Sequence, residues 1–205
     1  MARIAAALLA CLALCAAALA ADDAGCAIAR ARTDAAGVAT YTAECRWPVA
    51  PHFVAAIVGN AKAIAAVSSS LAESTKLPDG RVLNVHSPGW PVDDRQSTLA
   101  IERAPLEEGG LLLSYRLARE QAPLAAGRVQ ARRDEGRWEI RSDGAGGTRL
   151  HYEATYDAGG SLPVSLVQRT VRRSLAESLG ELRAAAEASS ATQRTPQRGK
   201  ARGRD

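Results

Sequence analysis

The sequence predicts an α+β domain in which a curved antiparallel sheet of about six to seven strands surrounds one long C-terminal helix. Three observations predict it. Segments between residues 38 and 156 alternate apolar and polar side chains, as strands do. The links between most of these segments are short, which favours antiparallel neighbours. The last apolar stripe has helical spacing, and only this helix is long enough to cover the concave face of the sheet.

The two ends of the chain differ from its body. Residues 1–20 predict a cleavable secretory signal, because an early cation precedes an apolar run that ends in the small-residue motif Ala18-Leu19-Ala20. An uncleaved membrane anchor and a lipoprotein signal are the alternatives. We expect a single folded domain over residues 21–188. Residues 189–205 contain no apolar side chain larger than alanine except one proline, so we expect a disordered basic tail.

The formal net charge of +4 comes from these ends. The tail holds five cations and one anion, whereas residues 21–188 hold 20 cations and 21 anions. The body of the chain therefore gives no case for nucleic-acid binding. The tail is either a solubilising extension or a segment attracted to anionic lipid head groups or cell-wall polymers.

Two cysteines, Cys26 and Cys45, remain once a signal is removed. They flank the turn-like residues 34–37, so a hairpin over residues 26–45 would bring them together at its open end. We expect a disulfide there, in a secreted or periplasmic protein. Two free buried thiols are the alternative.

The first core strand is predicted at Val38–Trp47, where alternation ends at Pro48. Residues 52–71 then place apolar side chains near helical spacing. Gly59 and Asn60 interrupt this segment and predict two short helices rather than one.

Five further strands are predicted, each ended by turn residues. They are Arg81–Ser87, Ser97–Arg103, Leu111–Ala118, an arm at Val129–Arg133 with a continuation through 136–143, and Thr148–Tyr156. The long helix is predicted at Ser161–Ala188, with Ser161 as its cap and Pro163 in its first turn.

Three motifs in this order carry a resemblance to a known family. Trp90-Pro91-Val92 followed by Arg95 matches a Trp-Pro-x-x-x-Arg turn before a strand, Trp138 opens a late strand, and residues 157–163 lead into the last helix. With these motifs the chain resembles the START-type lipid-binding domains of the helix-grip (Bet v 1-like, SRPBCC) superfamily over Val38–Glu187. Gln96 departs from the family, whose members usually have aspartate there.

The resemblance implies a cavity between the sheet and the long helix for a lipid, sterol, polyketide or other hydrophobic ligand. The helix and strand positions that would line it are Trp90, Arg95, Leu99, Ile101, Leu113, Tyr115, Trp138, Tyr152, Val167, Val171 and Leu175. For each apolar member the alternative is an ordinary place in the hydrophobic core.

Arg95 is the sharpest of these candidates. Its guanidinium could bind a ligand carboxylate or phosphate, or it could pair with Asp93, Asp94 or a strand carboxylate. His86, on the preceding strand, is a further candidate for the cavity wall. Adjacent Asp93 and Asp94 diverge in a turn, and the sequence contains no nucleophile motif, no zinc-ligand spacing and no cofactor motif.

The sequence therefore predicts an exported, non-enzymatic carrier of a hydrophobic ligand such as a lipid, fatty acid or sterol, with transient membrane contact as the ligand enters and leaves. The rival hypothesis is an enzyme of the polyketide cyclase or aromatase type, with Arg95, His86 or Tyr115 as polar groups in the same cavity. A third is an adhesion or partner-binding module whose pocket is filled by side chains.

Overall fold

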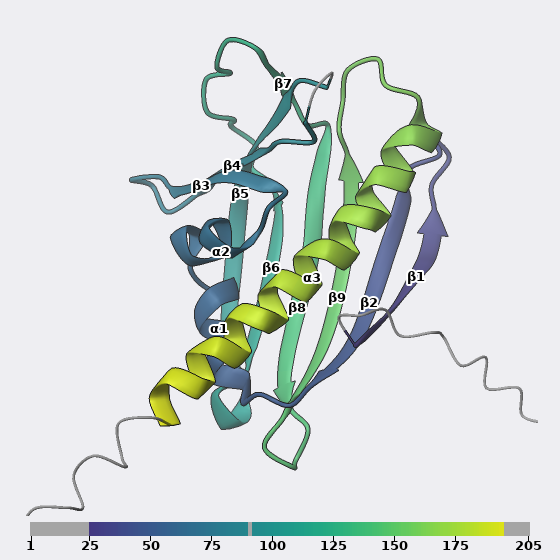
Figure 1. Ribbon diagram of the computed structural model, residues 1–205. Helices are drawn as coiled ribbons and strands as arrows, with labels where there is room; N and C mark the ends of the chain where they lie inside the picture. Colours follow the sequence, from purple (N-terminus) through teal and green to yellow (C-terminus); the bar gives the residue numbers. More distant parts are fainter. Residues whose placement is uncertain (1–24, 90–91, 195–205) are drawn as a thin grey trace, which may run out of the picture.

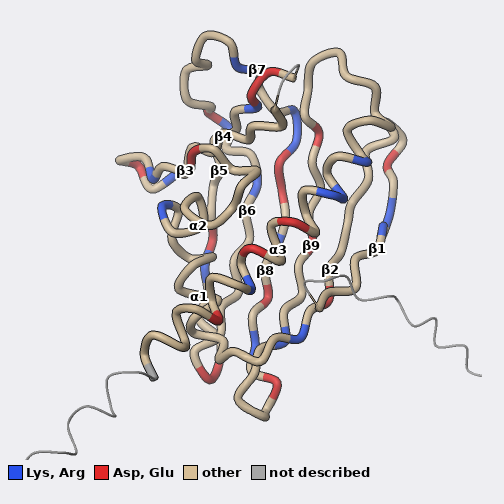
Figure 2. Tube along the Cα trace, in the orientation of Figure 1, with Lys and Arg blue, Asp and Glu red and all other residues tan. Residues whose placement is uncertain are grey.

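A single twisted sheet packs against one side of the long helix α3 in the computed structural model, which describes residues 25–89 and 92–194 (Figure 1). Basic and acidic residues are interspersed over the sheet and along α3 (Figure 2). The strands are β1 Cys26–Thr33, β2 Ala39–Trp47, β3 Leu71–Lys76, β4 Val82–His86, β5 Asp94–Pro105, β6 Leu111–Leu117, β7 Arg128–Gln130, β8 Arg133–Ser142 and β9 Thr148–Asp157. The helices are α1 Pro51–Val58, α2 Ala61–Val67, the short 3-10 turn η1 Glu107–Gly109 and α3 Val164–Arg194. The predicted α+β arrangement is confirmed.

The sheet has the strand order β1-β2-β9-β8-β6-β5-β4-β3, and every neighbouring pair on this path is antiparallel. It has nine strands, more than the six to seven predicted. One addition is β3, a strand at the edge of the sheet whose sequence LAESTK has weak strand propensity. The other arises because the chain crosses the sheet at Ala131 and Arg132, whose N–H groups donate to Gln96 on β5 and Asp157 on β9. This crossing separates β7, which pairs in parallel with β5, from β8.

The N-terminal hairpin forms as expected. Strands β1 and β2 pair in a register that sets Cys26 opposite Cys45, and the two side chains form a disulfide with a Cα–Cα distance of 4.2 Å. The turn is fixed by Asp34, whose Oδ1 accepts hydrogen bonds from the N–H groups of Ala36 and Val38. The disulfide thus ties the edge strand β1 to the interior strand β2.

The break predicted between the two short helices is also present. Pro51 occupies the first turn of α1, where its missing N–H costs nothing, and the N–H of Gly59 donates to Ala55 at the end of that helix. Asn60 then caps α2, because its Oδ1 accepts from the N–H of Ala63 at 3.1 Å. Both helices pack beside α3 (Figure 1).

The long helix α3 starts later and ends later than predicted. It begins at Val164, with the carbonyl of Pro163 accepting from the N–H of Val167 at 3.2 Å, so Ser161 lies in the preceding turn and is not the cap. At its other end the hydroxyls of Ser189 and Thr192 donate to carbonyls four residues earlier and accompany the helix to Arg194. The remainder of the predicted tail and all of residues 1–20 lie outside the described residues.

The two halves of α3 are buried to different degrees. Leu175, Leu179, Leu182 and Ala186 pack into the core that the sheet and α1 enclose, whereas none of residues 164–174 is fully buried. Where the structure describes the chain, it contains no helix both long and apolar enough to cross a membrane. The first half of α3 therefore covers a space that it does not fill.

Candidate functional site

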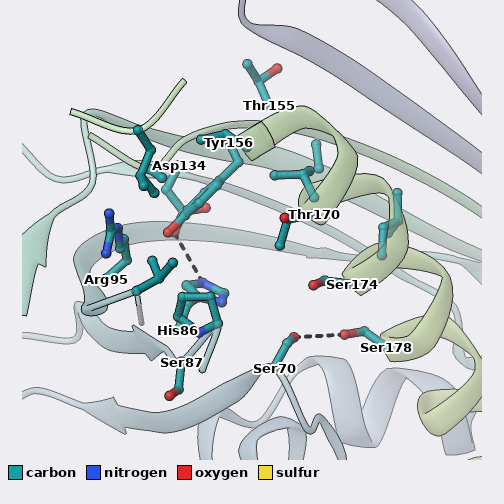
Figure 3. A pocket seen from close by; sticks show the side chains of 18 of the residues that line it. Ser70, His86, Ser87, Arg95, Asp134, Thr155, Tyr156, Thr170, Ser174 and Ser178 are labelled. Atoms are coloured by element: carbon teal, nitrogen blue, oxygen red, sulfur yellow. Dashed lines mark hydrogen bonds and ion pairs between the residues drawn. The ribbon is translucent and has the colours of Figure 1, made fainter. Parts of the chain in front are cut away.

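That space is a cavity of about 310 Å³, here called the large chamber, between the first half of α3 and strands β4, β8 and β9 (Figure 3). Its remaining wall comes from the loop before β5 and from residues 158–162 before α3. Apolar side chains such as Val167, Val171 and Leu175 contribute to the wall on the helix side. Its volume is at the lower end of the range that small-molecule sites occupy.

A second cavity of about 150 Å³, here called the small chamber, lies under α2 and the middle of α3. The apolar side chains of Leu99, Leu113 and Trp138 are part of its wall. The two chambers adjoin, because six side chains line both of them. These are Ser70, His86, Tyr115, Asp134, Tyr152 and Ser178.

Tyr115 and Tyr152 meet at this boundary, with their hydroxyl oxygens 2.7 Å apart. Burial raises the pKa of both phenols, so both keep their protons at neutral pH. Gly136 makes the contact between them possible, because a Cβ at this position would lie 2.6 Å from the Tyr115 hydroxyl and 2.2 Å from the carbonyl oxygen of Glu153. The glycine is the register partner of Tyr115, whose ring lies over it.

A buried acid stands on the sheet side of the large chamber. Asp134 at the start of β8 accepts a hydrogen bond from the Ser97 hydroxyl at 2.6 Å, and its Oδ2 lies 3.8 Å from Nε2 of His86. The His86 ring also meets the edge of the Tyr156 ring, with 5.4 Å between centroids. The Tyr156 hydroxyl is buried without a hydrogen-bond partner, and burial raises its pKa. Histidine, acid and phenol thus form one polar end of the chamber.

Arg95 belongs to the same end. Its side chain is only 5 % exposed, and Nη1 donates to the backbone carbonyl of Asp93. Within the described part of the chain no carboxylate oxygen lies within ion-pair distance of it, so the pairing with Asp93, Asp94 or a strand carboxylate that the sequence left open is not formed. Its Nε is buried without a partner. The neighbouring Gln96 instead holds the loop after β6, donating to the carbonyl of Pro123 at 3.0 Å.

Hydroxyl groups line the helix side of the large chamber. Thr170, Ser174 and Ser178 follow one another at four-residue spacing along α3 and face the sheet (Figure 3). The Ser178 hydroxyl lies within hydrogen-bonding distance of two others, at 3.1 Å from the hydroxyls of both Ser68 and Ser70. These serines join α3 to the chain just before β3.

The residues that the sequence predicted for the site gather around the two chambers. Arg95, Val167, Val171 and Leu175 line the large chamber, Leu99, Ile101, Leu113 and Trp138 line the small one, and Tyr115 and Tyr152 line both. Trp90 lies outside the described residues. His86 lines both chambers, as its position on the strand suggested. That these residues contact a ligand stays a prediction.

Sequence reasoning missed several polar members of the wall. Asp134 and the hydroxyls of Ser70, Ser174 and Ser178 were not singled out. The helical positions carried a usable signal, since Ser174 and Ser178 continue the same face as Val167 and Val171. No pattern in the sequence pointed to Asp134, because the crossing of the chain at residues 131–132 sets which face of β8 points inward.

No protein-family model matches the sequence, and no curated protein is similar to it in sequence. The structure, by contrast, resembles many solved ones. A STAR-related lipid transfer protein from Xanthomonas axonopodis (fragment 25–204) superposes with a TM-score of 0.69 and 23 % identity, over 80 % of this chain and 94 % of that one. Human StAR-related lipid transfer protein 5 superposes with a TM-score of 0.71 and 14 % identity, over 80 % and 83 % of the two chains.

An enzyme is among the similar structures. The Zhui aromatase/cyclase from Streptomyces sp. R1128 superposes with a TM-score of 0.54 and 12 % identity, over 73 % of this chain and 94 % of that one. The likenesses show that this chain has the START-type helix-grip fold that the motifs predicted. A fold shared by lipid-transfer proteins and a cyclase does not choose between them, so function has to be argued from the site.

Proposed function

We propose that the protein is an exported carrier that holds a hydrophobic ligand, such as a lipid, a fatty acid or a sterol, between the sheet and α3. The observation that carries the proposal is the large chamber of about 310 Å³, whose helix side combines apolar side chains with a row of hydroxyls and whose ionisable groups His86, Arg95 and Asp134 lie on the sheet side. An apolar cavity with a few convergent polar groups is the usual form of a small-molecule site. The lipid-transfer proteins that share the fold support the same function.

Binding can be tested by displacement of the uncharged dye Nile red from the purified protein, together with native mass spectrometry of protein taken from its own host. We expect dye uptake and a co-purified lipid. Val171→Trp places a large ring inside the chamber and should abolish uptake, whereas Val164→Trp, at a position 43 % exposed, should leave it unchanged. A wild-type protein that binds neither dye nor lipid would rule out the carrier function.

Export is supported by the disulfide between Cys26 and Cys45, since such bonds persist in oxidising compartments. It is also supported by the signal-like composition of residues 1–20. N-terminal sequencing of the protein from its own host tests this part of the proposal. We expect a mature chain that starts near Ala21, and an uncleaved Met1 would contradict cleavage.

Transient membrane contact is proposed at the first turn of α3. Leu166 lines the large chamber and is nevertheless 47 % exposed, so it forms an apolar edge through which a ligand can pass between chamber and bilayer. Leu166→Gln should slow ligand transfer between vesicles without lowering binding at equilibrium. Leu124→Gln is the matched control, because Leu124 is 50 % exposed and does not line the chamber. Equal slowing by both variants would contradict the proposed edge.

The cyclase or aromatase alternative is favoured by one observation, the approach of the half-buried His86 to the buried Asp134 in a chamber that the phenol of Tyr115 also lines. A histidine near a carboxylate is an arrangement that can move protons. If the protein cyclises a linear polyketide mimic, and His86→Ala abolishes product formation while Nile red still binds, the enzyme replaces the carrier. Unchanged product formation in His86→Ala would exclude His86 from any such reaction.

A further inference from the structure

The polar end of the large chamber holds a cation without a carboxylate partner. Arg95 is 5 % exposed, and the only hydrogen bond of its side chain within residues 25–89 and 92–194 joins Nη1 to the Asp93 carbonyl. A guanidinium has five N–H donors and stays charged at any physiological pH. Buried charges in folded proteins are normally paired, so an unpaired one that lines a cavity indicates an anion that the chain itself does not supply.

A second donor stands on the same side of the chamber. The Tyr156 hydroxyl is buried without a partner, and it keeps its proton because burial raises the pKa of the phenol. In Figure 3 the side chains of Arg95 and Tyr156 lie on the sheet side, across the chamber from the row of hydroxyls on α3. A carboxylate has two acceptor oxygens, so it can accept hydrogen bonds from the guanidinium and from the phenol at the same time.

Asp134 lines the same chamber, and its carboxylate could repel an anionic ligand bound at Arg95. Its Oδ2 accepts from Ser97 and lies 3.8 Å from the His86 ring, so its described partners are Ser97 and His86 and not Arg95. This end of the chamber thus holds one cation without a carboxylate partner, Arg95, and one acid that is already hydrogen-bonded, Asp134. Such a balance of charge favours a ligand with a single negative charge. A phosphate monoester, with nearly two charges at neutral pH, would meet the repulsion of Asp134 without a second cation to offset it.

We propose that the ligand is an amphiphile with one carboxylate headgroup, which binds the guanidinium of Arg95 and the hydroxyl of Tyr156 while its apolar chain runs along α3 toward the small chamber. The inference rests on the proposed carrier function and names its ligand class. Tyr115 and Ser178 line both chambers, so the apolar chain of a ligand that extends from Arg95 toward the small chamber would contact these two residues.

The test compares three probes with the same hydrocarbon chain on the full protein at pH 8, where a carboxylic acid is ionised. Displacement of Nile red is measured with hexadecanoate, hexadecanol and hexadecyl phosphate, each kept below its solubility limit or micelle concentration. We expect hexadecanoate to bind about 10- to 100-fold more tightly than hexadecanol, the range that a hydrogen bond to a charged group supplies. Hexadecyl phosphate should bind more weakly than hexadecanoate.

Variants then locate the headgroup. Arg95→Gln should abolish the preference for acid over alcohol, and Tyr156→Phe should reduce it several-fold. Arg116→Gln is the matched control, because Arg116 is an exposed cation on β6 that pairs with Glu102 and does not line the chamber. Nile red uptake by each variant shows that its chamber is folded, and the comparison of probes on the wild-type protein does not depend on any variant.

The outcomes separate the two proposals. Equal affinity for hexadecanoate and hexadecanol overturns the carboxylate inference and leaves the carrier function standing. Binding of none of the three probes and no Nile red uptake overturns the carrier function itself. A preference for hexadecanoate that persists in Arg95→Gln places the headgroup elsewhere and overturns the assignment to Arg95, and tighter binding of hexadecyl phosphate overturns the single-charge argument.

Discussion

Loss of the disulfide between Cys26 and Cys45 should destabilise the folded domain by a predictable amount. The two residues are 19 apart in sequence, and opening a loop of this length restores about 3 kcal/mol of conformational entropy to the unfolded chain. For a domain of this size that corresponds to a fall in Tm of roughly 6–12 °C. The bond also holds the edge strand β1, which hydrogen-bonds only to β2 within the described sheet.

The assay is urea unfolding of the wild type and of the double variant Cys26→Ala/Cys45→Ala, each with and without dithiothreitol. Reductant should shift the wild type to the midpoint of the variant and leave the variant unchanged, because the variant has no bond to reduce. Both sulfurs are buried, so alanine is preferred to serine, which would add an unsatisfied hydroxyl. A difference below about 1 kcal/mol between oxidised wild type and variant would refute the loop-entropy argument.

Two further changes test the sheet and its turns. Gly136→Ala should lower the free energy of unfolding by about 1–3 kcal/mol, because the new Cβ would collide with the Glu153 carbonyl and the Tyr115 hydroxyl; an unchanged urea midpoint would contradict the close approach. In the turn between β8 and β9, hydrogen bonds from the N–H groups of Ala145 and Gly147 lower the pKa of the Asp143 carboxyl. These hydrogen bonds stabilise the folded protein only while the carboxyl is ionised. Asp143→Ala should therefore destabilise the protein at pH 7, and progressively less as the pH falls below 3.8. A difference between the two proteins that stays constant from pH 7 to pH 3 would contradict this role.

The sequence contained enough information for most strands and for the order of elements. In β9, Leu150, Tyr152 and Ala154 alternate with polar residues, and all three are buried as the alternation predicted. The same alternation assigns Tyr156 to the inward face, where its hydroxyl meets the large chamber. Periodicity thus predicts which side of a strand points inward, provided that the strand is continuous.

Prediction failed where a contact between distant residues decides the outcome. The parallel pairing of β7 with β5 depends on the crossing at residues 131–132, and no local pattern marks it. For Arg95 the sequence offered nearby carboxylates as well as a ligand. In the structure the guanidinium donates to the backbone carbonyl of Asp93, although Asp93 and Asp94 lie next to it in the turn and at the start of β5. Nearness in sequence therefore did not predict the partner of this side chain.

We infer that stability and the proposed ligand passage depend on different halves of α3. The second half buries Leu179 and Leu182 in the core, and withdrawing it would expose apolar surface at a cost of about 1.5–3 kcal/mol for each side chain. The first half is held near Gln168 by two polar ties, in which the Tyr41 hydroxyl donates to the carbonyl of Gln168 and the Gln168 amide donates to the carbonyl of Gly37. Water can replace such ties when they open, so displacing the first half costs far less than displacing the second. We therefore expect a ligand bound in the large chamber to leave past the first turns of α3, where Leu166 is already exposed.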